Sequence, residues 1–285
     1  MAGAHHAATV AKVATKRSAA QPWLEFLERV GYVVRGVLYA AMGVFALGLA
    51  LGLGGTATDQ RGSLVILTGG TAGRVLLFAV VIGLGAFSTW GFVRAVFDPL
   101  NRGTDPSGIA ERLGFAWSGF AYLSIVFFAL HLLAGSASDA SHDSTHETIA
   151  RILSYPLGQT AAVVIGVVAV SAGLGQLLEA IRGRFRRDLK RSEMTGAEKK
   201  TVDLLGRIGM VSRGVVFSLV GWFILEGAVN RDPSRVHGFG YAFLFLLEQP
   251  YGRVLLGVVS LGFIALGLHS SASARWIRLL GSGPG

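Results

Sequence analysis

The stretch ERVGYVVRG, from Glu28 to Gly36, decides the fold because a similar stretch occurs twice more along the chain. ERLGFAWSG runs from Glu111 to Gly119, and GRIGMVSRG runs from Gly206 to Gly214. Each copy keeps an arginine, a glycine two residues later and a second glycine five residues after that. These motif residues are Arg29, Gly31, Gly36, Arg112, Gly114, Gly119, Arg207, Gly209 and Gly214. The chain therefore contains an internal triplication.

A second block follows each copy of the motif, in three 29-residue windows that align without a gap. The windows are residues 67–95, 152–180 and 246–274. A glycine occupies the same position in all three, as Gly73, Gly158 and Gly252. Each repeat is thus a pair of segments, the first opening with the arginine motif and the second with this glycine.

The repeated segments have the length and composition of membrane spans. Charge-free stretches cover residues 36–58, 75–93, 113–138, 152–178 and 254–274, and each reaches the roughly 18 residues that can cross a hydrocarbon core of about 30 Å. A sixth segment is interrupted by Arg213 and Glu226, and it is predicted to be a span because its repeat equivalents are. The expected spans are 32–54, 75–97, 113–135, 158–180, 208–229 and 253–275.

The pattern of apolar residues in these segments predicts helices rather than barrel strands. A membrane strand alternates apolar and polar residues over about ten positions, whereas Val163–Val170 is apolar on every side. The predicted fold is an all-α membrane protein with six transmembrane helices, arranged as three parallel-oriented two-helix repeats with approximate threefold symmetry. Short apolar elements at 64–67, 149–153 and 243–247 are expected to lie flat on the membrane or to plug the outer end.

The chain divides into three repeats and two other segments. Residues 1–27 are expected to be a disordered or interfacial N-terminal segment, and residues 182–203 a basic cytoplasmic linker with eight Lys and Arg. Repeat 1 is predicted at 28–97, repeat 2 at 110–181 and repeat 3 at 204–276.

The positive charge of the chain predicts its orientation. The net charge is +9, but the charge is not spread evenly: 18 of the 26 Lys and Arg fall in loops on the N-terminal side, and six fall on the opposite side. Lys and Arg accumulate on the cytoplasmic face, so both termini are expected in the cytoplasm, with the protein in a bacterial plasma (inner) membrane. The expected partners are membrane lipids with anionic headgroups, and a protein partner or a second copy; nucleic acid is not expected.

The triplicated helix pair with its Arg-x-Gly entry resembles the bacterial membrane family known as domain of unknown function 1206. The resemblance covers about Arg29 to Arg275, and it implies three membrane helix pairs but no biochemical activity. Repeat 2 departs from the pattern, because Ser118 replaces the second arginine of the motif and Gln159 replaces the arginine that follows the glycine of the second segment.

Arg35 and Arg213 are the first candidates for a binding site. They lie six residues beyond Arg29 and Arg207, which is roughly 9 Å deeper along a helix. An ionisable side chain inside a span suggests a functional site. Two interpretations are open: the side chains extend back to the cytoplasmic headgroups or pair between helices, or they bind an anion or a lipid headgroup.

His131 and Glu226 are the second candidates, at equivalent positions of repeats 2 and 3. Under threefold symmetry they would approach each other near the outer face, where an imidazole and a carboxylate can relay protons. The alternative is that both are polar caps at the ends of their spans.

Asp139, His142, Asp143, His146 and Glu147 share one face if the second outer loop is helical, and such a set can bind zinc. The surrounding small polar residues favour a solvated loop instead, so no metal and no cofactor is expected. The chain has no cysteine, which excludes disulfides and thiolate chemistry. No nucleotide-binding or hydrolase motif occurs, so an enzyme is not expected.

These observations favour an integral membrane protein of unknown biochemical activity with a structural, lipid-interacting or partner-binding role. The alternative is a transporter or channel for a small solute or ion, built from three parallel repeats.

Overall fold

Six long helices dominate the computed structural model, which describes residues 26, 29–67, 70–98, 103–135 and 144–277. They are the first span Arg29–Ala50, α3 (Gly70–Phe97), α4 (Pro106–Leu133), α6 (Gly158–Arg182), α7 (Gly196–Asn230) and α9 (Gly252–Trp276). All six are long and apolar enough to cross a membrane, which confirms the predicted spans. The predicted N-terminal segment, residues 1–27, lies outside the described residues except for Phe26.

The outer surface of these helices is apolar. Phe78, Ile82, Trp222 and Val258 are each more than half exposed, and exposed apolar surface on this scale marks contact with lipid or a partner. The surface therefore suits a hydrocarbon environment.

Two helices begin at least seven residues earlier than the sequence predicted. α7 begins at Gly196 because Thr195 and Glu198 form a reciprocal capping box: the Glu198 amide donates to Thr195 Oγ1 at 3.3 Å, and the Thr195 amide donates to Glu198 Oε2 at 2.7 Å. α4 begins with Pro106 in its first turn, where proline is tolerated. The helical regions consequently extend beyond the apolar stretches on the N-terminal side.

One close contact between helix backbones occurs three times. A Cβ atom added to Gly36 would lie 2.6 Å from the carbonyl oxygen of Gly267 in α9. In the same way, a Cβ added to Gly119 would lie 3.1 Å from the carbonyl oxygen of Ser88, and one added to Gly214 would lie 2.9 Å from that of Gly173. These positions are equivalent in the repeats, so the first helix of each repeat packs on the second helix of the preceding repeat. Repeat 1 takes repeat 3 as its predecessor, which closes a ring with approximate threefold symmetry.

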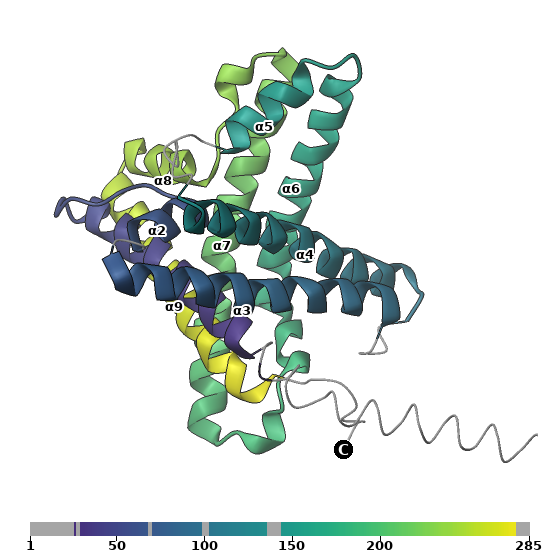
Figure 1. Cartoon of the computed structure of the whole chain (residues 1–285), viewed down its shortest axis with the longest axis vertical. Coiled ribbons are helices and arrows are strands. Elements are labelled where there is room, and N and C mark those ends of the chain that lie inside the picture. Colours follow the sequence, from purple (N-terminus) through teal and green to yellow (C-terminus); the bar gives the residue numbers. More distant parts are fainter. Residues whose placement is uncertain (1–25, 27–28, 68–69, 99–102, 136–143, 278–285) are drawn as a thin grey trace, which may run out of the picture.

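The pairs formed by this contact cross one another. α3 lies beside α4 and α6 beside α7, and the two pairs run in different directions in the view of Figure 1. α7 also packs on α9 within repeat 3, whereas α4 and α6 of repeat 2 make at most marginal contact. The predicted hairpin is therefore a packed pair in repeats 1 and 3 but not in repeat 2.

Three short helices connect the two long helices of each repeat, at the three positions where the sequence predicted short apolar elements. They are α2 (Gln60–Leu67), α5 (Ser144–Leu153) and α8 (Phe239–Glu248). α8 is the most apolar of the three, and its Ala242 and Phe243 are fully buried against α7 and α9. α8 thus packs against α7 and α9 with part of its surface buried.

The basic segment 182–203 is folded rather than extended. It contains the 3₁₀ turns η1 (Arg184–Asp188) and η2 (Arg191–Glu193), followed by the first turns of α7. The Asp203 carboxylate forms salt bridges with Arg186 at 3.1 Å and with Arg191 at 2.7 Å. Part of the positive charge of the segment is therefore neutralised within the protein.

The threefold contact predicts the effect of one added methyl group. In Gly267→Ala the new Cβ would lie 2.5 Å from the Gly36 carbonyl oxygen and 2.7 Å from the Ala40 amide nitrogen, and backbone atoms cannot move aside cheaply. We expect the free energy of unfolding to fall by about 1–3 kcal/mol, which lowers the unfolding temperature in detergent. Gly257→Ala is the matched control, because no atom lies within 4 Å of its Cβ. Equal unfolding temperatures for the two variants would contradict the contact.

Candidate functional site

Arg35 reaches into the protein, where it contacts α9 and two aromatic rings. Its Nε donates to Ser270 Oγ of α9 at 3.1 Å, and Ser270 Oγ donates to the Tyr32 carbonyl oxygen at 2.9 Å. Its guanidinium carbon lies 4.6 Å from the centre of the Tyr32 ring and 4.9 Å from that of Phe87. Such cation–π contacts stabilise a charge that has lost much of its water.

Arg213, the equivalent residue of repeat 3, lies between two other rings. Its guanidinium carbon is 5.0 Å from the centre of Phe217, one turn farther along α7, and 5.4 Å from that of Tyr39 in the first span. The side chain thus extends away from the N-terminal end of α7 and lies against rings of two different helices. Its Nε is buried and has no hydrogen-bond acceptor.

A buried pair of tyrosine hydroxyls joins repeats 1 and 2 beside these arginines. Tyr39 Oη and Tyr122 Oη are 2.9 Å apart, and both residues are almost fully buried. Tyr39, Tyr122 and Phe217 are equivalent residues, each ten positions after the first arginine of its motif. This position therefore brings the first helices of the three repeats together at the centre of the fold.

We call Arg35, Arg213, Tyr39, Tyr122 and Ser270 the central cluster. The sequence prediction found the two arginines and missed the other three residues. The signal was present for two of them, because tyrosine recurs at the same position of repeats 1 and 2. No sequence signal distinguishes Ser270, which faces Arg35 only because α9 packs on the first span.

The charge of the central cluster is not balanced. Within the part of the chain that the structure describes, the carboxylates that form ion pairs do so with other cations, and none pairs with Arg35 or Arg213. A buried charge without a partner is unfavourable by several kcal/mol. The cluster therefore offers donors and positive charge without a matching anion.

Aromatic rings cover the cluster at both ends of the helices. On the side of α8, the ring centre of Phe239 lies 4.9 Å from that of Phe217, and the ring centre of Phe243 lies 5.4 Å from that of Phe263. On the side of η1, the ring of Phe185 lies 5.3 Å from the ring of His269, a residue of α9 that lies near Arg35 of the first span. Packed rings at both ends favour a closed interior over an open channel along the axis.

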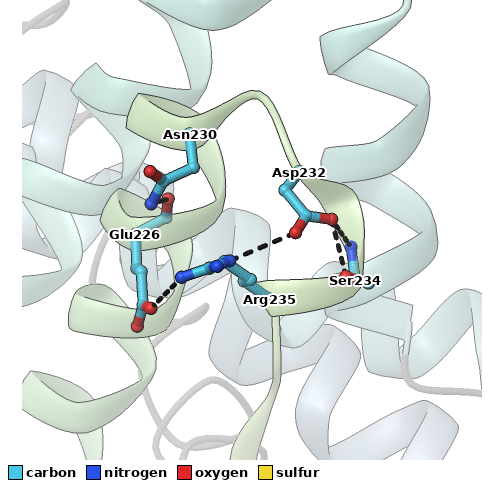
Figure 2. Close-up of polar contacts among 5 residues, drawn as sticks. All are labelled: Glu226, Asn230, Asp232, Ser234 and Arg235. Atoms are coloured by element: carbon cyan, nitrogen blue, oxygen red, sulfur yellow. Dashed lines mark hydrogen bonds and ion pairs between the residues drawn. The ribbon is translucent and has the colours of Figure 1, made fainter.

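His131 and Glu226 are not brought together. His131 is exposed, and its Nδ1 lies 2.8 Å from the Phe127 carbonyl oxygen of its own helix. Glu226 Oε1 accepts from Arg235 at 2.8 Å, after the end of α7 (Figure 2). The geometry agrees with the alternative that both are polar caps, and it provides no imidazole–carboxylate pair for proton relay.

The candidate metal loop is only partly described. Asp139, His142 and Asp143 lie outside the described residues. His146 lies in α5, where its Nδ1 is 3.2 Å from the Val236 carbonyl oxygen. Within the described ranges no group of three His, Asp or Glu residues is placed to hold a metal ion.

Arg112 and most of the glycines of the motif have structural roles. Arg112 closes the C-terminal end of α3, because it donates to the carbonyl oxygens of Ala95 at 2.8 Å and Val96 at 3.0 Å. Gly31 and Gly209 allow close packing within repeats 1 and 3. The motif therefore specifies how the helices pack.

This geometry defines a class: a multi-pass membrane protein with three pseudo-equivalent helix pairs and a cationic cluster at their centre. The chain belongs to the family described as Domain of Unknown Function (DUF1206), whose model matches residues 30–98, 113–183 and 208–276. It is similar to a protein of Bacillus subtilis (strain 168) named Uncharacterized protein YxxB, with 29% identity over 250 residues that cover 88% of this chain and 90% of that protein. No solved structure matches the chain.

The tyrosine pair predicts a measurable coupling. In Tyr39→Phe the buried Tyr122 hydroxyl loses its partner, which is expected to lower the free energy of unfolding by about 1–3 kcal/mol. In the double variant Tyr39→Phe/Tyr122→Phe the loss should be smaller than the sum of the two single losses. Thermal unfolding of the four proteins measures the coupling, and strictly additive losses would contradict a direct hydrogen bond.

The turn after α7 predicts a pH dependence. Hydrogen bonds from the Ser234 hydroxyl and amide, and then from Arg235, lower the pKa of the Asp232 carboxyl below its ordinary value of 3.8 (Figure 2). The ionised Asp232 carboxylate thus stabilises η3 (Pro233–Arg235) fully above pH 3.8, and this stabilisation is lost as pH falls through the lowered pKa. Amide exchange at Ser234, corrected for its intrinsic pH dependence, should accelerate on acidification, and Asp232→Asn should remove this step. An unchanged step in the variant would assign it to another group.

Proposed function

We propose that this protein binds an anionic group inside the membrane, between the first helices of its repeats. The observation that carries the proposal is the pair of interior arginines without a carboxylate partner, one of which has a buried Nε without an acceptor. An ionised arginine at the centre of a membrane helix is unfavourable by about 2.5–3.5 kcal/mol or more. A bound anion offsets this cost through charge-assisted hydrogen bonds.

The chemistry of the cluster suits a phosphate or carboxylate group. A guanidinium group presents several donors in one plane, which matches the oxygens of these anions. Ser270 and the tyrosine hydroxyls add neutral donors at the same place. The distribution of Lys and Arg supports an orientation with both termini in the cytoplasm of a bacterial plasma membrane.

A binding role fits the interior better than a conducting role does. The aromatic contacts of Phe239 and Phe243 fill the outer side of the cluster, and Phe185 lies at the inner side. The proposal therefore treats the protein as a binder of an anion and leaves the role of transporter aside.

Arginine substitution tests this proposal. Wild-type protein is purified in native lipid, and its bound anions are identified by mass spectrometry beside Arg35→Gln and Arg213→Gln. Each arginine contributes charged hydrogen bonds of about 1.5–3 kcal/mol, so we expect each variant to retain about tenfold less of the anion.

The matched control is Arg253→Gln, because Arg253 is an exposed arginine at the start of α9. It should retain the anion at the wild-type level. The same anion profile in wild type and both interior variants would overturn the proposal.

A further inference from the structure

The two helices of repeat 2 differ from the other pairs at the position where those pairs make contact. In repeat 1 the first span packs on α3 where Val34 meets Gly83, and a Cβ on Gly83 would lie 3.1 Å from Val34. In repeat 3 the equivalent residues are Ser212 and Gly262, which are also in contact. Repeat 2 has a tryptophan and a valine there, Trp117 and Val168. A tryptophan and a valine are too large for the close contact that Gly83 and Gly262 make in the other two repeats.

The faces of α4 and α6 that would form this pair have no partner in the chain. Trp117 is 54% exposed, whereas its equivalents Val34 and Ser212 are 6% and 4% exposed. Gly114 and Gly175 have no atom within 4 Å of a Cβ, unlike the packed Gly31 and Gly209. The buried share of the span is 28% for α4 and 17% for α6, against at least 44% for the other four spans.

These unpartnered faces lead to the central cluster. Gly114, Ser118 and Tyr122 follow one another at four-residue intervals on α4, so they share one side of the helix. Tyr122 bonds to Tyr39 within the cluster, and α6 lies beside α7, which carries Arg213. Ser118 stands where the other repeats have their interior arginine. The ring is therefore open on the side where the third arginine is missing.

We propose that an anionic phospholipid occupies the space between α4 and α6, with its phosphate at Arg213 and Arg35 and an acyl chain on Trp117 and Val168. This inference rests on the proposed anion binding and names the source of the anion. The two ends of the helices are covered by Phe239 and Phe185, while the open side faces the hydrocarbon. A ligand that arrives from the bilayer needs no aqueous route.

The chemistry of the open side matches both parts of such a lipid. The exposed Trp117 and Val168 are apolar and suit an acyl chain. The interior offers the buried Arg213 Nε, which lacks an acceptor, and a phosphate oxygen supplies one. Lipid-facing apolar surface and an interior cation are joined along one side of α4.

The test fills the open side and measures lipid retention. The protein is reconstituted in bilayers of phosphatidylcholine with a minority of phosphatidylglycerol, and bound lipid is counted by native mass spectrometry. We expect wild type to retain phosphatidylglycerol about tenfold over its share of the bilayer. Gly114→Phe/Gly175→Phe and the milder Gly114→Leu should lose this enrichment, because their side chains occupy the space of the acyl chain.

The matched control is Gly257→Phe, since its equivalent in repeat 1 is Phe78, which is 58% exposed, and no atom lies within 4 Å of its Cβ. It should keep the enrichment, and Arg213→Gln should lose it. Enrichment that persists in both Gly114 variants, which are first checked for wild-type unfolding temperature, overturns the inference.

A parallel measurement with inorganic phosphate separates the two proposals. Arg213-dependent binding of phosphate without enrichment of phosphatidylglycerol would overturn lipid binding and leave anion binding intact. Absence of both would overturn both. A stable dimer of the wild type that Gly114→Leu dissociates would show that a second copy of the chain covers these faces, and it would also overturn the inference.

Discussion

The fold depends on how closely two helix backbones can approach at one position of the repeat. Gly36, Gly119 and Gly214 each place a first helix against the second helix of the preceding repeat. Between helices in lipid the apolar side chains gain little from leaving the hydrocarbon, so tight van der Waals packing holds them together. A side chain at this position would push the pairs apart, and the ring could not close.

The close packing also explains how two arginines are accommodated in the interior. Because α9 lies directly against the first span, Ser270 reaches Arg35. Because the first helices meet at the centre, Tyr39 of repeat 1 provides a ring for Arg213 of repeat 3. These contacts reduce the cost of burying the cations without neutralising them, and the unbalanced charge is the basis for the proposed anion binding.

Much of the fold could be predicted from the sequence, and the reasons are local. Charge-free length and the threefold motif identify six spans, and the repeat equivalence rescues the span that Arg213 and Glu226 interrupt. The pairing within repeat 2 could not be predicted by analogy, since Trp117 and Val168 change the packing while they preserve the hydropathy. Two residues of the central cluster could be predicted, because Arg35 and Arg213 are charges in apolar segments. Tyr39, Tyr122 and Ser270 join the cluster only through contacts between helices that are distant in the sequence. His131 and Glu226 do not pair: His131 bonds to its own helix and Glu226 accepts from Arg235 in the turn after α7, contacts that the sequence did not indicate.

The contact between the first span and α9 makes the ring independent of the linkers that join its parts. A single ancestral helix pair would form the same ring as a homotrimer, in which every copy must carry the same residues. Fusion of three copies into one polypeptide removes that restriction, because each copy can then mutate separately. Ser118 and Trp117 are changes of this kind, and they give the assembly one distinct side that identical subunits could never provide.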